Sequence, residues 1–196
     1  MQSAIHTLKK ALRKDLKSRI KLLTDDAKRM ESKEVTKKLL NSSYYKQSSR
    51  ISVYLSMPSE VDTNEILLDV FKTGKQCFIP LYTETDMKMV LLKGMDDYES
   101  LPLTSWNIKQ PSEDEGRETA ISSGGLDLIL MPGLGFTKDG LRIGRGRGYY
   151  DNYLMKHSEL IGKSPVTVGL AFSQQICPDV PCTENDIKLD QVLYPD

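Results

Sequence analysis

The chain has 196 residues, of which 39% are hydrophobic and 28% charged, as is ordinary for one soluble globular domain with a sizeable core. Lysine plus arginine and aspartate plus glutamate number 27 each, so no global charge favours nucleic acid or an acidic membrane as a partner. No apolar run reaches the roughly 18 residues of a membrane helix. Three cysteines without a C-x-x-C pair or a secretory leader indicate reduced thiols, so we expect a cytoplasmic protein.

The N-terminal part of the chain is predicted to be helical. The residues Leu8, Leu12, Leu16 and Ile20 lie four apart and form one apolar stripe of a long first helix. This basic segment could also resemble a transit peptide, but its apolar pattern favours structure. Cap-type residues open a second predicted helix, over residues 24–42.

A strand–helix–strand unit follows. Residues 50–56 and 76–82 are rich in β-branched and aromatic side chains and predict two strands. Between them, Asp62 and Glu65 form a capping-box-like helix start, and Gly74 ends the helix. The unit has the size of a parallel crossover.

The rest of the chain alternates further predicted strands with loops and one helix. Residues 87–92 predict an antiparallel hairpin strand, and the polar segment 93–125 predicts a long functional loop. The almost continuous apolar run that begins at Leu126 predicts a strand buried on both faces. The remaining predicted elements are a helix over 149–158 and strands at 166–172 and 190–194, the last at an edge. We therefore expect an α/β fold with an open, mostly parallel sheet and helices on both faces, in a single domain over residues 1–196.

The segment GRGRGYYD, residues 144–151, predicts an anion site. Glycines let backbone amides approach a ligand, the following helix presents its N-terminal amides, and Arg142, Arg145 and Arg147 add donors suited to phosphate. The segment matches neither the Walker A motif nor the dinucleotide fingerprint. A solvated basic loop, or an arginine-rich RNA contact, is the alternative interpretation.

Several polar residues near this loop have two interpretations each. Asp151 is either a helix N-terminal acid or a magnesium ligand beside phosphate. Lys9 and Arg13 share a helix face that could simply be solvated, and Glu60 is either turn polarity or a substrate-binding carboxylate. Asp186, just before the last strand, is by itself only a polar loop residue. The two histidines lie on predicted helices among charged neighbours, so a histidine-based nucleophile is not expected.

The segment LILMPGLGFTKDGLRIGRGRGYYDNYL resembles the hallmark segment of the 5-formyltetrahydrofolate cyclo-ligase family, also called 5,10-methenyltetrahydrofolate synthetases. The similarity extends over nearly the whole chain, in order. It includes KKALRKDLKSR, RISVYLSMPSE, LPLTSWNIKQP and ICPDVPCTENDIKLDQVLY, and the eukaryotic members look most similar.

The resemblance implies ATP- and magnesium-dependent closure of 5-formyltetrahydrofolate to 5,10-methenyltetrahydrofolate, with release of ADP and phosphate, in one-carbon metabolism. In that mechanism the formyl oxygen attacks the γ-phosphate, and a neighbouring folate nitrogen then displaces phosphate as the ring closes. No protein nucleophile is needed. The implied fold is again an open α/β sheet.

Roles for individual residues also follow from the resemblance. It implies magnesium ligands at Asp151 and Asp186, and catalytic residues at Arg145, Arg147 and Tyr150. Position 147 is where lysine is expected in many relatives, and a leucine is usual at position 143. The implied ATP contacts are Lys9, Arg13, Arg142, Ile143, Gly144, Arg145, Gly146, Arg147, Gly148, Tyr149 and Tyr150. The implied folate contacts are Leu55, Glu60, Arg145, Gly146, Arg147, Gly148 and Tyr149, with Trp106 added as an aromatic face for the pterin.

The expected partners are the small molecules 5-formyltetrahydrofolate and ATP, with no nucleic acid and no membrane, and the chain is expected to be a monomer. Two other classes of function are weighed against this one. A phosphosugar or CoA-type isomerase would use the anion loop without consuming nucleotide. An RNA-binding module would bind RNA in a salt-dependent way and have no affinity for ATP.

Overall fold

The centre of the fold is a six-stranded sheet with the order β3-β2-β1-β4-β7-β9. The computed structural model describes residues 2–104 and 108–196, so Trp106 lies outside the described residues. All neighbouring strands pair parallel except β2 and β3, which form an antiparallel hairpin at one edge. The strands are β1 (Arg50–Ser52), β2 (Gln76–Tyr82), β3 (Met87–Leu92), β4 (Leu128–Met131), β7 (Val166–Leu170) and β9 (Gln191–Leu193).

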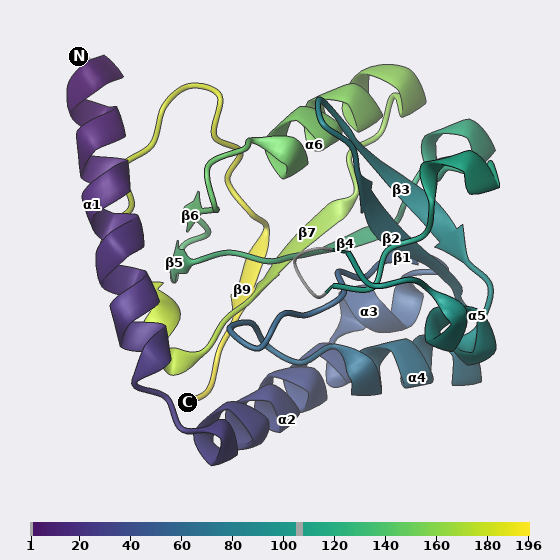
Figure 1. Cartoon of the computed structure of the whole chain (residues 1–196), viewed down its shortest axis with the longest axis horizontal. Helices are drawn as coiled ribbons and strands as arrows, with labels where there is room; N and C mark the ends of the chain where they lie inside the picture. The colour runs from purple at the N-terminus through teal and green to yellow at the C-terminus, as the bar shows by residue number, and fades with distance from the viewer. Residues whose placement is uncertain (1, 105–107) are drawn as a thin grey trace.

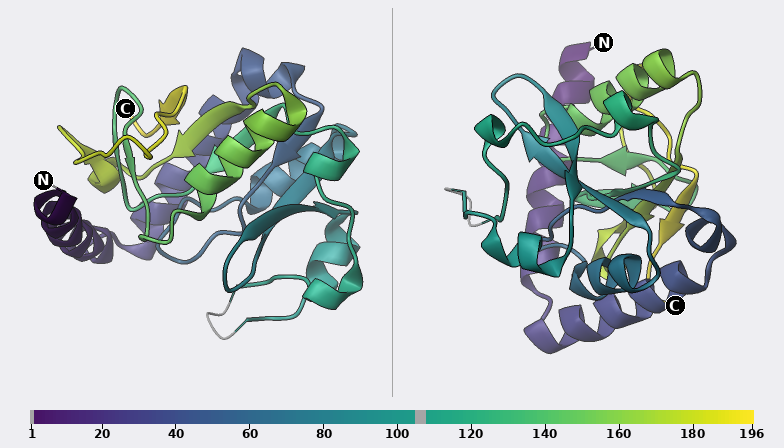
Figure 2. Two further views of the ribbon diagram at one scale, coloured as in Figure 1. Left: turned by 90° about the horizontal axis from the view of Figure 1, so that it is seen from above. Right: turned by 90° about the vertical axis from the view of Figure 1, so that its right-hand side faces the viewer.

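Helices cover both faces of this sheet, as predicted. Figure 1 shows α6 above the sheet and α2, α3 and α4 below it, and Figure 2 shows the same layers from two other directions. None of the described helices has the length and apolarity to cross a membrane. The helices are α1 (Gln2–Lys21), α2 (Asp25–Asn41), α3 (Ser43–Gln47), α4 (Asn64–Lys72), α5 (Met95–Ser100) and α6 (Tyr149–Ile161).

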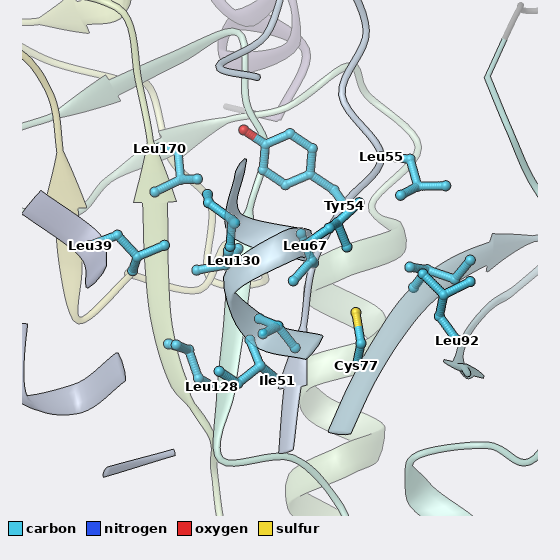
Figure 3. Packing of buried hydrophobic residues seen from close by; sticks show 14 of the residues in the cluster. Leu39, Ile51, Tyr54, Leu55, Leu67, Cys77, Leu92, Leu128, Leu130 and Leu170 are labelled. Atoms are coloured by element: carbon cyan, nitrogen blue, oxygen red, sulfur yellow. The ribbon is translucent and has the colours of Figure 1, made fainter. Parts of the chain in front are cut away.

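Strand β4 shows why the sheet needs helices on both sides. All four of its residues are buried, and successive side chains point to opposite faces. Leu128 and Leu130 belong to the core between the sheet and the helices α2 and α4, which Figure 3 shows with Ile51 and other labelled side chains. Ile129 and Met131 belong to the second core, under α6. The continuous apolar run near residue 128 therefore predicts this strand correctly.

Helix α1 lies apart from these layers, against a small second sheet that the sequence pattern does not predict. Leu16 and Ile20 pack with Ile143 and Cys177 of this sheet. Leu8 was expected in the same stripe but is 56% exposed. Residues four apart drift about 40° around a helix, so Leu8 points away from the face that holds Ile20. The small sheet has the order β6-β5-β8 and contains β5 (Gly135–Thr137), β6 (Arg142–Ile143) and β8 (Ile176–Cys177).

The segment predicted as one strand over 50–56 is a strand only as far as Ser52. The Val53 amide still donates to Phe78, at 2.8 Å, but the Tyr54 carbonyl accepts from the Thr63 hydroxyl instead of from a neighbouring strand. The same hydrogen bond engages the residue at which helix α4 starts. Thr63 is the N-cap of α4 without a side-chain capping bond, so the start predicted at Asp62 is wrong by one residue.

The segment 93–125 was predicted as a loop without regular structure, and this is wrong for its described part. It contains α5 and short 3₁₀ turns at Glu113–Glu115 and Ile121–Ser123. Arg117 holds the segment together, because its guanidinium donates twice to Asp97, at 2.7 Å each. Polar contacts of this kind leave no hydrophobic period in the sequence, so the pattern could not predict them.

Candidate active site

A cavity of about 490 Å³ opens at the carboxyl ends of three neighbouring strands. Tyr54 follows β1, Tyr82 is the last residue of β2, and Pro132 follows β4. Open α/β sheets bind ligands at this edge. The cavity is lined by Lys9, Arg13, Tyr54, Leu55, Met57, Glu60, Tyr82, Pro132, Gly133, Arg142, Ile143, Gly144, Arg145, Gly146, Arg147, Gly148, Tyr149, Tyr150, Asp151 and Asp186.

Every site residue that was named from the sequence and lies within the described ranges lines this cavity. Helix α1 supplies Lys9 and Arg13, and the segment after β1 supplies Leu55 and Glu60. The glycine loop and the first turn of α6 supply the largest share, and Asp186 comes from the turn before β9. The structure thus brings together segments that lie far apart in the sequence.

The glycine loop has the backbone that was expected at two of its three glycines. Gly146 has a φ of 107° and Gly148 a φ of 70°, both in the left-handed region that favours glycine. Gly144 has no positive φ; a Cβ there would lie 3.0 Å from the guanidinium of Arg142. Gly148 is also the N-cap of α6 and has no side chain to cap it, so a ligand or water is left to pair with the first amides of that helix.

Helix α1 supports the loop from outside. The Arg13 Nε donates to the Gly144 carbonyl at 2.9 Å. The Arg13 guanidinium also lies 3.5 Å from the place where a Gly146 side chain would begin. Arg13 therefore contacts the loop backbone, and Lys9 donates to Asp186, so these two residues do not form a merely solvated face.

Glu60 is a buried carboxylate, 8% exposed, that faces the loop. Its Oε1 accepts from Arg145 at 3.1 Å, and its Oε2 accepts from the Met57 amide at 3.0 Å. Burial raises the pKa of Glu60, and the Met57 hydrogen bond and the Arg145 charge offset only part of that rise. A carboxylate in this state pairs strongly with N–H groups that replace its lost water.

The two acids predicted as magnesium ligands both line the cavity. Asp151 Oδ1 accepts from the Ile187 amide at 3.1 Å, so the first turn of α6 is fastened beside Asp186. Asp186 Oδ2 accepts from the Thr183 amide and hydroxyl and from Lys9. Burial by itself raises the pKa of Asp186, but these hydrogen bonds outweigh it and hold the pKa below its ordinary value.

This pair of acids fits a magnesium ion whose other ligands come from a nucleotide. The described residues contain no group of three or more His, Cys, Asp or Glu side chains that could hold a metal. Magnesium is usually bound by one or two carboxylates together with substrate phosphates and water, so two carboxylates beside an anion loop are an adequate donor set.

Tyrosines form one wall of the cavity, and only Tyr149 and Tyr150 among them were predicted from the sequence. The Tyr82 and Tyr150 hydroxyls are 3.4 Å apart, and the Tyr149 hydroxyl donates to the Thr83 carbonyl at 2.9 Å. The rings of Tyr82 and Tyr149 contact each other with centroids 5.4 Å apart. Burial raises the pKa of Tyr82 to about 12 and that of Tyr150 well above its ordinary value, so both hydroxyls stay protonated and can donate hydrogen bonds.

Five lining residues were missed: Tyr54, Met57, Tyr82, Pro132 and Gly133. All of them lie at or just after the carboxyl ends of β1, β2 and β4. The position of the predicted strand ends was therefore the signal that could have found them.

His157 has a structural role and not a catalytic one. Its Nε2 accepts from the Leu126 amide at 2.9 Å, which places the proton on Nδ1, 3.1 Å from the Lys163 carbonyl. The side chain is fully buried and does not line the cavity.

A model of the 5-formyltetrahydrofolate cyclo-ligase family matches residues 5–195. The chain belongs to this family. It is 48% identical over 197 aligned residues to the mouse 5-formyltetrahydrofolate cyclo-ligase, covering 98% of this chain and 96% of the mouse protein. It is 28% identical to the mitochondrial 5-formyltetrahydrofolate cyclo-ligase of Arabidopsis thaliana, covering 98% and 76% of the two chains. The solved 5,10-methenyltetrahydrofolate synthetase of Aquifex aeolicus superposes with a TM-score of 0.75 at 28% identity, covering 95% of this chain and 89% of that one.

These similarities confirm that the chain is an enzyme of the cyclo-ligase family and that its fold is the family's single α/β domain with a mostly parallel sheet. They do not assign individual residues. The roles of the cavity residues in a cyclo-ligase therefore stay predictions, which the geometry of the cavity supports.

Proposed function

We propose that the protein converts 5-formyltetrahydrofolate to 5,10-methenyltetrahydrofolate in an ATP- and magnesium-dependent reaction that releases ADP and phosphate, in one-carbon folate metabolism. One observation carries the proposal: a single cavity joins a cationic glycine loop to a buried carboxylate, Glu60. The loop suits a polyphosphate, and the carboxylate suits the N–H groups of a pterin.

ATP would be bound by its phosphates. The left-handed Gly146 and Gly148 have no Cβ, so a phosphate can approach the loop backbone at these two positions, and the first turn of α6 adds its uncapped amides. Lys9, Arg13 and Arg142 lie around the loop and would neutralise phosphate charge. The binding is then a matter of charge and backbone geometry, as is usual for phosphoryl transfer.

The folate would lie against Leu55, Glu60 and the tyrosine wall. Glu60 would accept hydrogen bonds from N–H groups of the pterin, and Leu55 and the ring of Tyr82 offer apolar surface to its flat ring. Trp106 stays a predicted aromatic contact, outside the described residues.

The reaction needs no group from the protein to form a covalent bond. The formyl oxygen attacks the γ-phosphorus and ADP leaves; the neighbouring folate nitrogen then attacks the formyl carbon and loses its proton while phosphate leaves. Arg145 and Arg147 would donate to the transferred phosphoryl group, and the protonated Tyr150 hydroxyl would donate to an oxygen of the reacting groups. Holding the two substrates together in one water-poor cavity would supply much of the acceleration.

Magnesium would be held by Asp151 and Asp186 together with phosphate oxygens. When bound, it would reduce the negative charge that the attacking oxygen meets. The two carboxylates would thus position the nucleotide within the cavity.

The test is the absorbance of the methenyl product with purified protein, 5-formyltetrahydrofolate, ATP and magnesium, together with a measurement of ADP. Product formed with one ADP per turnover supports the proposal, and no product with the complete mixture contradicts it. An isomerase would leave the ATP unconsumed, and an RNA-binding module would bind RNA and have no affinity for ATP.

The remaining predictions concern the whole chain. A single cyclo-ligase domain over residues 1–196 is supported by the family match over 5–195. A monomer in the cytoplasm, with small molecules and no nucleic acid as partners, stays a prediction. The name of the Arabidopsis relative shows that the family also includes a mitochondrial member.

A further inference from the structure

Both predicted metal ligands are already paired with a cation of the protein. Lys9 Nζ lies 2.5 Å from Asp186 Oδ2, and Arg142 Nη2 lies 2.8 Å from Asp151 Oδ2. All four side chains are largely buried and line the same cavity. The site is thus a neutral set of two acids and two bases.

Arg142 has a donor left over. Its Nη1 donates to the Pro132 carbonyl at 3.2 Å and its Nη2 to Asp151, but among the described residues its buried Nε has no hydrogen-bond partner. Buried donors without a partner are rare and call for an explanation. Because the Nε is closed to the cavity in this arrangement, the guanidinium has to turn before an anionic oxygen there can accept from it.

These contacts decide how a divalent cation can enter. A cation that arrives alone must separate Lys9 and Arg142 from their carboxylates and leave both positive groups in a largely buried site without a counter-charge, which is costly. A cation that arrives with a nucleotide brings phosphates that can receive Lys9 and Arg142. Every charge then exchanges one partner for another.

We propose that Lys9 and Arg142 occupy the metal ligands of the free protein and transfer to the nucleotide phosphates when the metal binds, so that the divalent cation and the nucleotide bind as one unit. The inference rests on the proposed function, because it takes Asp151 and Asp186 as the metal ligands. It gives Lys9 and Arg142 a positioning role beyond contact with ATP: each keeps a carboxylate in place and closed to a free cation.

The experiment measures the binding of Mn²⁺ by electron paramagnetic resonance, without folate and without turnover. Mn²⁺ is titrated into the full chain alone and with saturating adenylyl imidodiphosphate, with correction for Mn²⁺ that binds the nucleotide in solution. The nucleotide should tighten Mn²⁺ binding about tenfold or more, within the range usual for coupled sites. An equal Mn²⁺ affinity with and without nucleotide overturns the inference.

Two variants show whether the ion pairs cause the coupling. Lys9→Met removes the charge and keeps the chain length, so Mn²⁺ alone should bind several-fold more tightly while the nucleotide binds more weakly. Asp186→Asn should have the opposite effect: it should lose Mn²⁺ and bind metal-free nucleotide more tightly, because Lys9 is no longer paired. A pair that only stabilises the fold would give no gain in either variant, and that result would also overturn the inference.

Lys10→Met is the matched control, because Lys10 is exposed on the same helix. This variant should bind Mn²⁺ and the nucleotide as the parent does. If one variant fails to fold, the other still tests the exchange. Failure of the proposed function is separately visible, because ring closure is measured with folate and the coupling without it.

Discussion

The guanidinium of Arg145 lies 3.1 Å from the carboxylate of Glu60, although the two residues are 85 positions apart in the chain. The contact joins the anion loop to the segment that leaves β1. Arg145 is half exposed while Glu60 is buried, so the arginine can turn toward a phosphate and the glutamate cannot leave. We therefore regard Glu60 as the fixed point of the substrate pocket and Arg145 as its movable partner.

Glu60→Gln should weaken the use of folate and leave nucleotide binding nearly unchanged. The amide has one accepting oxygen where the carboxylate has two, and its NH2 group would face a donor, so N–H groups of the pterin would be left unpaired in a buried place. We expect kcat/KM for 5-formyltetrahydrofolate to fall about 100-fold or more, a change of about 2.7 kcal/mol. Nucleotide affinity, measured by titration calorimetry, should stay within about threefold. Ser59→Ala is the control, because Ser59 accepts from the same arginine but is only partly buried and carries no charge. An equal loss of folate use and nucleotide binding would mean that Glu60 is structural.

The parts of the fold that could be predicted from the sequence are those with a strong hydrophobic period. The hairpin strand at 87–92 was predicted with its observed bounds, and the strand near Leu128 was predicted because burial of all four of its residues leaves a continuous apolar signature. The small sheet was not predicted. Its strand Arg142–Ile143 has only two residues, too few to show a period.

More of the candidate site than of the small sheet could be predicted, because residue type and not hydrophobic period carries the signal. Glycines and arginines in alternation indicate anion chemistry without any structure. The exchange between cations and carboxylates could not be predicted, because Lys9 and Asp186 are 177 residues apart and only the fold brings them together. The sequence also contains no sign that the Thr63 hydroxyl donates to the Tyr54 carbonyl, the contact beside which the first strand ends.

Asp151→Asn should lower both activity and stability, unlike a change at an exposed acid. Asp151 balances the buried charge of Arg142, and an amide leaves that charge without a counter-ion. We expect turnover to fall about 100-fold or more and the free energy of unfolding to fall by about 1–3 kcal/mol, measured by urea titration. Asp139→Asn is the control, because Asp139 pairs with Lys188 at the surface and should change neither quantity much. Wild-type turnover in Asp151→Asn and Asp186→Asn alike would remove the metal assignment.

His157 should make stability fall as the pH falls below about 6.5. Burial lowers the pKa of this imidazole from its ordinary 6.5, so the folded protein keeps it neutral. Between pH 6.5 and the lower folded pKa the unfolded chain binds a proton that the folded protein does not, and each pH unit then costs at most about 1.4 kcal/mol.

Unfolding in urea at pH 7.5, 6.5 and 5.5 measures this loss. The decline should be smaller in His157→Gln, whose amide does not titrate and can still pair with the Leu126 amide. His6→Gln is the matched control, because His6 is the other histidine of the chain and is exposed on α1. An unchanged decline in His157→Gln, with the same decline in His6→Gln, would mean that other groups cause the pH dependence.

Arg147→Lys should keep activity within about tenfold of the parent, a difference of about 1.4 kcal/mol in the barrier. Arg147 is exposed in the loop, so the shorter side chain meets no packing constraint. Lysine keeps the charge and loses only the planar fork of the guanidinium. Arg147→Met, which has no charge, should lose far more, and the absorbance of the methenyl product measures both. A dead lysine variant would mean that the fork itself is required.

Gly146→Ala should reduce nucleotide affinity and turnover sharply while the fold survives. The φ of 107° at Gly146 is poorly accessible to alanine, so the loop must change its backbone or pay strain. A new Cβ would meet only Arg13, at 3.5 Å, which is ordinary contact, so the expected loss comes from the backbone and not from a clash. Gly124→Ala is the matched control, because Gly124 has a φ of 111°, open space around it, and a place on the exposed surface outside the cavity. Both variants should lose a similar 1 kcal/mol or so of stability. Only Gly146→Ala should lose affinity for ATP, with a Kd at least about tenfold higher by calorimetric titration. If Gly146→Ala binds ATP like Gly124→Ala, the arginine side chains and not the loop backbone hold the phosphates.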